Sequence, residues 1–251
     1  MTMTITKRFE EHVASVRMLL NFDRDVLDLA IRSLRELSEK LKKHHKLDNP
    51  HLSVDGTLRV IENIHQNESL HSRYKIIVNQ GLVLLVSYFA SSVHDLFRQG
   101  VQGALEKDDG SPLFKENVKV SLRELKDVGF EVKDLVPDLL IQTRDISFQD
   151  MQSISRAFKD HLGIEITKDV SVNNVILGQA CRHVIVHAGG FANDRFVYQV
   201  SNAKPRTVKP TITPGEIIEF TQPEIDIIAE SMAKYLSNVE ASVADRISSV
   251  A

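Results

Sequence analysis

Three residues near the end of one predicted helix carry side chains suited to phosphate chemistry. They are Arg182, His183 and His187, and two glycines, Gly189 and Gly190, follow them. Histidine exchanges a proton near neutral pH, and arginine grips phosphate oxygens with a planar fork of N–H donors. Together these side chains can hold a phosphate group and move a proton beside it.

The surrounding residues predict the helix that positions this set. Ser171 and Asn174 are typical of a helix start, because their side-chain oxygens accept hydrogen bonds from free N–H groups. Apolar residues then recur at helical spacing and mark one buried face: Val172, Ile176, Ala180 and Val184. Gly189 and Gly190 end the helix, since glycine enters the left-handed conformation at little cost.

The helix geometry decides which side chains meet. His183 and His187 are four residues apart, so they share one face. Arg182 lies roughly 140° around the helix from His187 at 3.6 residues per turn, and its long side chain still reaches the helix end. His187 is in the last turn, where the carbonyl end of the helix favours a protonated imidazole. The spacing therefore predicts acid–base chemistry on a phosphate.

This pattern resembles the signature of the HEPN superfamily, the higher eukaryotes and prokaryotes nucleotide-binding domain. That signature is an arginine and a histidine separated by four residues near the end of a late helix, with a polar residue, often asparagine, after the arginine. Arg182, His183 and His187 occupy those positions. The likeness covers roughly residues 67–251. Many members are metal-independent ribonucleases of toxin–antitoxin, CRISPR-associated and abortive-infection systems.

The resemblance implies cleavage of RNA by transesterification, in which a 2′-hydroxyl attacks the adjacent phosphate. His187 would act as general base or acid, Arg182 would hold the phosphate, and His183 would orient substrate or partner residues. HEPN nucleases usually pair two motifs across a dimer, so a homodimer is expected. An antitoxin or another defence-system protein is a further expected partner.

Relatives often carry an acidic residue on the long first helix of the domain, near the catalytic pair. In this chain the corresponding position is Ala90, and Asp95 is the candidate substitute. This departure supports an alternative function, a catalytically inert HEPN module that binds RNA, a nucleotide or a protein partner.

Four basic residues after the motif predict a path for RNA: Arg195, Lys204, Arg206 and Lys209. Phe196–Tyr198 and Ile217–Phe220 are short strand candidates, which leaves room for a small β-hairpin around the basic residues. The basic run Lys40–Lys46 is an alternative phosphate contact, although such a run also suits a solvated helix end.

Two other interpretations of the motif stay open. Arg182 and His187 can serve as core polar residues that bridge helices. His183 and His187 also form an HxxxH pair, but a catalytic zinc site needs a third protein ligand, which only folding could bring from His94 or His161. No cofactor is expected. The single cysteine, Cys181, excludes an internal disulfide and suits a small buried apolar position.

The remaining pattern predicts an all-α fold, a helical bundle with a long central helix. Ser69 to about Leu105 is apolar on more than one face, as in the centre of a bundle. We expect an N-terminal helical extension over residues 1–66 and a HEPN-like bundle over 67–251. The amphipathic stretch Leu27–Leu41 is the best support for a third function, a purely helical interaction protein.

Composition limits the possible partners and location. The formal net charge is −3, so RNA contact requires a local basic patch. The start, Met1–Arg8, lacks the apolar core of a signal peptide, and the longest apolar run, Leu82–Val86, is too short to span a bilayer. These observations predict a cytoplasmic protein without a membrane partner.

Overall fold

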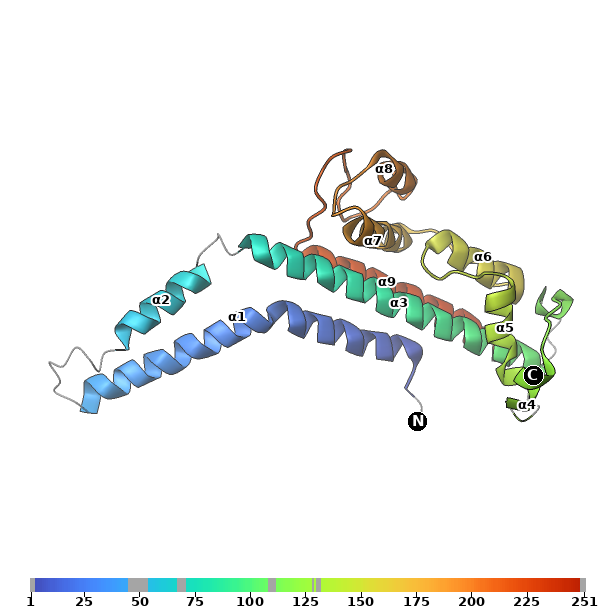
Figure 1. Cartoon of the computed structure of the whole chain (residues 1–251), viewed down its shortest axis with the longest axis horizontal. Helices are drawn as coiled ribbons and strands as arrows, with labels where there is room; N and C mark the ends of the chain where they lie inside the picture. Colours follow the sequence, from blue (N-terminus) through green and yellow to red (C-terminus); the bar gives the residue numbers. More distant parts are fainter. Residues whose placement is uncertain are drawn as a thin grey trace.

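Helices account for nearly all the regular structure in the computed structural model, which describes residues 3–44, 54–66, 71–107, 112–127, 129 and 132–248. Two long helices, α3 (His71–Lys107) and α9 (Gln222–Ser248), run side by side, and α7 (Val170–His187) lies across them (Figure 1). The described residues contain no strand, only an isolated bridge between Phe191 and Ile217. The all-α prediction is confirmed.

Helix α3 is the centre of the bundle because other helices cover most of its circumference. It contacts α1, α5, α6, α7 and α9, and its largest fully buried side chains are Leu82, Leu85, Phe89, Leu96 and Phe97. Within the described chain it is also the one helix long and apolar enough to cross a membrane, by length and composition. The core helix of a soluble bundle has the same length and composition, so this finding is weak evidence for a membrane span.

Two glycines bring neighbouring helices close to α3. A Cβ atom at Gly100 would lie 2.6 Å from Leu162, and one at Gly103 would lie 2.5 Å from Ile247. Real Cβ atoms do not approach other heavy atoms this closely, so with a larger residue the side chain of Leu162 in α6 (Met151–Leu162) or of Ile247 in α9 would have to shift. Glycine at these positions lets those two side chains pack directly on the backbone of α3.

Helix α1 (Ile5–His44) joins the bundle along its first turns, as far as Leu20, whose side chain packs against the core. Phe9 is fully buried, with its ring edge-on to Phe89 at 6.3 Å, and the backbone N–H of Ile5 donates to Glu240 at 2.8 Å. Residues 5–16, which the sequence assigned to an extension, thus contribute Ile5, Phe9, Val13 and Val16 to the common core.

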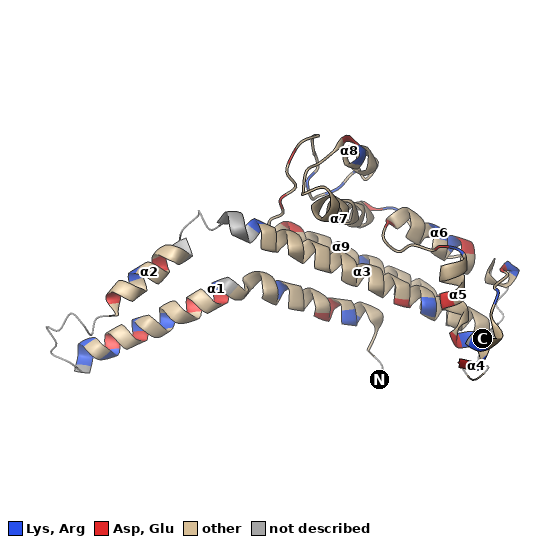
Figure 2. Ribbon diagram, in the orientation of Figure 1, with Lys and Arg blue, Asp and Glu red and all other residues tan. Residues whose placement is uncertain are grey.

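The remainder of α1 pairs with α2 (Asp55–Gln66), and we call residues 18–43 and 55–64 the arm. Arg35 binds Glu62 at 2.6 Å, and Ser38 donates to Asp55 at 2.7 Å. Figure 2 shows acidic and basic residues alternating along the arm, whereas the middle of α3 carries few charges. The far end of the Lys40–Lys46 run lies outside the described residues.

Short elements connect α3 to α7: η3 (Pro112–Lys115), α4 (Leu122–Asp127), η4 (Val132–Asp134), α5 (Val136–Thr143) and α6. The spacing of Ser147 and Asp150 is typical of a capping box with Ser147 as the N-cap, but the structure does not form that box. Asp150 is the N-cap of α6 and accepts from Ser153, while Ser147 accepts from Gln149 in the preceding turn. Gly163 ends α6 with a φ of 66°, a left-handed conformation that glycine adopts at little cost.

The strand prediction for Phe196–Tyr198 was wrong, because these residues lie in α8 (Asp194–Ser201). Asn193 caps this helix by accepting from the N–H of Phe196 at 2.9 Å. Phe196 and Val200, four residues apart, are its buried side chains, so a helical period positions its apolar residues. The predicted hairpin is absent from the described residues, and only Ile217 of the second candidate strand forms a bridge.

Candidate active site

The ends of helix α7 are defined by one carboxylate and two glycines. The N-cap is Asp169, two residues before the predicted start, and its side chain accepts from the N–H of Val172 at 2.8 Å. At the other end, Ala188 and Gly190 both donate to the carbonyl of Val184, while Gly189 and Gly190 adopt positive φ angles of 61° and 84°. This termination places His187 in the last turn.

The three predicted catalytic residues lie together at this end. His183 and His187 are exposed, and the centroids of their rings are 4.8 Å apart. Arg182 is half-buried, and its Nε atom is buried without a hydrogen-bond partner in the described part of the chain. The two imidazoles therefore adjoin on the exposed surface of the last turns of α7, and the partly buried Arg182 precedes His183 in the same turns.

Apolar side chains surround the histidines, and sequence reasoning missed them. Val186 shares the exposed face of α7 with His183 and His187, and about half of its surface is exposed. Phe191 and Ile217, joined by the isolated bridge, are also about half exposed. The sequence carries no signal for this, because Val, Phe and Ile are as frequent in cores as at such edges.

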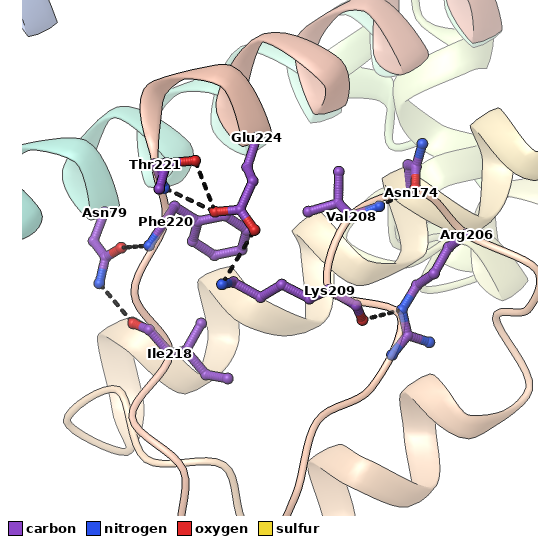
Figure 3. A network of polar contacts seen from close by, with 9 residues as sticks. All are labelled: Asn79, Asn174, Arg206, Val208, Lys209, Ile218, Phe220, Thr221 and Glu224. Atoms are coloured by element: carbon purple, nitrogen blue, oxygen red, sulfur yellow. Dashed lines mark hydrogen bonds and ion pairs between the residues drawn. The ribbon is translucent and has the colours of Figure 1, made fainter.

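The segment after α8 is fixed to the start of α7 by one buried amide. Asn174 donates to Thr207 at 2.9 Å and to Ser231 at 3.2 Å, and its oxygen accepts from the N–H of Thr207 at 3.1 Å. The same oxygen accepts from the N–H of Val208 at 3.4 Å (Figure 3). The sequence predicted Asn174 to belong to a helix start. In the fold it bridges α7, the segment and α9.

Two of the four predicted RNA contacts have internal partners instead. Arg206 is buried and donates to the carbonyls of Val200, Ala203 and Lys209 at 2.8, 3.1 and 2.9 Å. Burial lowers the pKa of its guanidinium. Lys209 pairs with Glu224 at 3.3 Å, and its Nζ lies 5.0 Å from the centroid of the Phe220 ring (Figure 3).

The other two predicted contacts, Arg195 and Lys204, are exposed. Arg195 is in the first turn of α8, and Lys204 lies in the segment between α8 and α9. The basic surface that can reach a phosphate backbone beside the motif is therefore smaller than the sequence predicted.

The segment before α9 connects the histidine end to α3. Ile218 donates to the carbonyl of Gly190 at 2.8 Å, and Asn79 of α3 donates to the carbonyl of Ile218 at 2.9 Å. Asn79 also accepts from Phe220 at 3.1 Å. Thr221 precedes α9 (Gln222–Ser248), and its N–H and hydroxyl donate to the carboxylate of Glu224, the return bond of a capping box (Figure 3).

The position that corresponds to the acidic residue of HEPN proteins is Ala90, and the candidate substitute, Asp95, lies away from the motif. Ala90 is buried in α3. Asp95 pairs with Arg8 of α1 at 3.3 Å and with His94 at 3.6 Å. Leu82 marks the contact of α3 with α7, and Asp95 lies ~20 Å farther along the helix, at ~1.5 Å per residue.

The histidines proposed to complete a zinc site have other neighbours. His94 lies edge-on to Phe148, with centroids 5.4 Å apart, and His161 lies 3.2 Å from Glu116. Within the described ranges no group of three or more His, Cys, Asp or Glu residues is arranged to hold a metal ion. Cys181 is buried, as predicted, and burial raises the pKa of its thiol.

Neither a family model, nor a curated protein, nor a solved structure matches this chain. The functional argument therefore depends on the chemistry of the site.

Proposed function

We propose that the protein is a metal-independent endoribonuclease of the HEPN type, with its site at the end of α7. The observation that carries the proposal is the pair of exposed imidazoles, 4.8 Å apart, next to an arginine whose Nε has no partner in the described protein. A guanidinium that is not neutralised by a carboxylate remains available to bind phosphate. The terminus of a long, well-packed helix holds these groups in place.

In the proposed reaction, His187 removes the proton of a ribose 2′-hydroxyl. The 2′-oxygen forms a bond to the adjacent phosphorus, and the bond from phosphorus to the 5′-oxygen breaks. The leaving oxygen takes a proton from a second imidazole, which leaves a 2′,3′-cyclic phosphate and a 5′-hydroxyl. Arg182 stabilises the charge that builds on the phosphate oxygens, and His183 orients the strand or the partner protomer.

The second imidazole is proposed to come from another copy of the chain. Val186, Phe191 and Ile217 border the histidines with half-exposed apolar surface, which suits burial against a second copy. Light scattering at micromolar concentration is expected to show a dimer. Replacing Val186 by Glu should give a monomer without cleavage activity, and a wild-type monomer that still cleaves RNA would contradict the composite site.

The experiment that tests the reaction is incubation of the purified protein with structured RNAs in EDTA. Wild type should cleave, and His187→Ala should lose a factor of ~10² to 10⁴, the usual contribution of general acid–base catalysis. Arg182→Lys should also be poor, because a point charge cannot reproduce a two-pronged grip on phosphate. His183→Asn should be mild, since asparagine is common at that position in HEPN proteins.

Other outcomes select the alternatives. If EDTA abolishes cleavage and zinc restores it, the HxxxH metal site replaces the proposed mechanism. If wild type binds RNA without cutting it, the protein is an inert HEPN module. The observation that favours this second function is Ala90, a buried methyl where the resemblance expects an acid.

The proposed RNA path runs over Arg195 and Lys204, the exposed basic residues near the motif. Reversing both charges should weaken binding and flatten its dependence on salt, because fewer counterions are released from the phosphates. Reversing two exposed arginines of the arm, Arg32 and Arg59, serves as the control of equal charge change. An unchanged salt slope would move the path elsewhere.

A further inference from the structure

The buried side of the motif contains a side chain whose polar atoms have no partner. Gln179 lies three residues before Arg182 and four before His183, so all three are neighbours on the helix surface. It is only 6% exposed, and neither its Nε2 nor its Oε1 has a hydrogen-bond partner in the described protein. With Nε of Arg182, three unpaired buried polar atoms lie within one turn.

This clustering is unusual in physical terms. Buried polar groups in folded proteins nearly always have hydrogen bonds, because leaving one unpaired forfeits its interaction with water. Methionine or leucine would fill a similar volume, with equal or better helix propensity and without that loss. The other buried amides of this helix make hydrogen bonds: Asn174 makes four, and Asn173 donates to the carbonyl of Pro205, although its Oδ1 has no partner in the described protein. Gln179 makes none in the described protein, and it lies within one helical turn of the motif.

The unpaired atoms, two donors and one acceptor, match a ligand that carries both a phosphate and a hydroxyl group. Nε of Arg182 and Nε2 of Gln179 are donors, and phosphate oxygens are acceptors. Oε1 of Gln179 is an acceptor, and the donor nearest a phosphate in RNA is the ribose 2′-hydroxyl, which DNA lacks. A site built to bond a hydroxyl discriminates against the analogue without it, since its own acceptor is then left unpaired.

We propose that Gln179 makes the site selective for RNA over DNA: its Nε2 and the Nε of Arg182 hold a phosphate, and its Oε1 accepts from a ribose 2′-hydroxyl of the bound strand. Access opens when the half-buried Arg182 side chain turns towards the phosphate. The proposal rests on the proposed function, because it takes RNA as the ligand. It concerns binding, so it does not require that the protein cleave.

The test compares binding of RNA and DNA strands of one sequence, by fluorescence anisotropy at fixed salt in EDTA. Every protein carries His187→Ala, so that the RNA stays intact. The background protein should prefer RNA, and Gln179→Met should reduce that preference about tenfold, the effect of one lost hydrogen bond. The melting temperature of the Gln179→Met protein should not fall, because the substitution removes unpaired buried atoms.

The control is Ile176→Met, one turn earlier on α7 at a partly buried apolar position, which should leave the preference for RNA unchanged. Gln179→Leu repeats the test if the methionine variant does not fold. The proposal is overturned if the ratio of RNA to DNA affinity is the same with and without Gln179. It is also overturned if the background protein binds RNA and DNA with equal affinity.

The failure of the two proposals can be told apart. If the preference for RNA depends on Gln179 but the wild-type protein does not cut RNA, only the nuclease mechanism is contradicted. If the wild-type protein cleaves RNA but Gln179→Met leaves the preference for RNA over DNA unchanged, only the proposed role of Gln179 is contradicted.

Discussion

The bundle and the arm are made of similar residues and differ in what surrounds them. Phe9 and Phe22 belong to the same helix, yet Phe9 is fully buried in the bundle and Phe22 is 62% exposed in the arm. The arm exposes further large apolar side chains: Met18, Leu19, Val26, Leu29, Leu37, Val60 and Ile64. A groove of about 770 Å³, lined by residues of α1, α3 and α9, separates it from the bundle.

This difference teaches that the continuity of a helix does not make it equally stable along its length. The first turns of α1 gain from burial against α3 and α9, whereas the arm is held by α2 and by exposed ion pairs such as Arg35–Glu62. Exposed ion pairs contribute little to stability. Substitutions in the bundle should therefore have large effects on the free energy of unfolding, and matched substitutions in the arm small ones.

The largest effect is expected for Phe9→Ala. Truncating a fully buried aromatic ring removes transfer free energy and leaves a cavity, with a typical loss of about 3–5 kcal/mol. Urea denaturation followed by circular dichroism measures the change. A loss below about 1 kcal/mol would show that the first turns of α1 do not belong to the core.

Asn174→Ala should come next, with a loss of about 3 kcal/mol. It removes four hydrogen bonds and leaves the N–H of Val208 buried without its acceptor. The same denaturation experiment measures it, with the exposed Asn238→Ala on α9 as control. Equal stability of the two variants would contradict the bracing role of Asn174.

Asp169→Ala should cost about 1 kcal/mol, the usual value of an N-cap. Hydrogen bonds from Lys234 first and from the N–H of Val172 second hold the pKa of Asp169 below its usual range. A carboxylate with a depressed pKa stabilises the fold above its unfolded pKa and loses that contribution as pH falls through the folded value. The deficit of the alanine variant at neutral pH should therefore shrink in acid.

Asp169→Asn is the control for this titration. Asparagine caps helices as well as aspartate does, but it carries no titrating charge. Its stability should stay near that of wild type, without the decline specific to the carboxylate. Parallel pH profiles for wild type and Asp169→Ala would show that the carboxylate does not titrate with folding.

The smallest effect is expected for Phe22→Ser in the arm. The side chain is largely exposed, so its loss should change the free energy of unfolding by no more than about 0.5 kcal/mol. Thermal unfolding measures this change beside Phe9→Ala. A loss comparable to that of Phe9→Ala would mean that the arm is covered in solution.

The sequence could predict those features that depend on local rules. The ends of α6 and α7 follow from glycines that adopt positive φ angles, and the box at Thr221 and Glu224 follows from its spacing. The closeness of His183 and His187 follows from four-residue spacing on a helix. The long central helix follows from an apolar surface that is too broad for one face.

Features that depend on distant partners could not be predicted. The sequence shows no partner for Arg206 or Lys209, so both were predicted to contact RNA. In the fold Arg206 donates to the carbonyl of Val200 in α8, and Lys209 pairs with the carboxylate of Glu224. Only folding brings those groups near. Phe196–Tyr198 has the composition of a strand. It forms a helix because Asn193 caps the first turn and because Phe196 and Val200 are buried on one helical face. The unpaired amide of Gln179 has no sequence signal at all.

The connection from Gly190 through Ile218 to Asn79 has a mechanical consequence. Two hydrogen bonds, each shorter than 3 Å, link the terminus of α7 to the early turns of α3. A displacement of that part of α3 would be transmitted through these two hydrogen bonds to the turn that follows His187. We therefore expect the position of the imidazoles to depend on the position of α3 around Asn79.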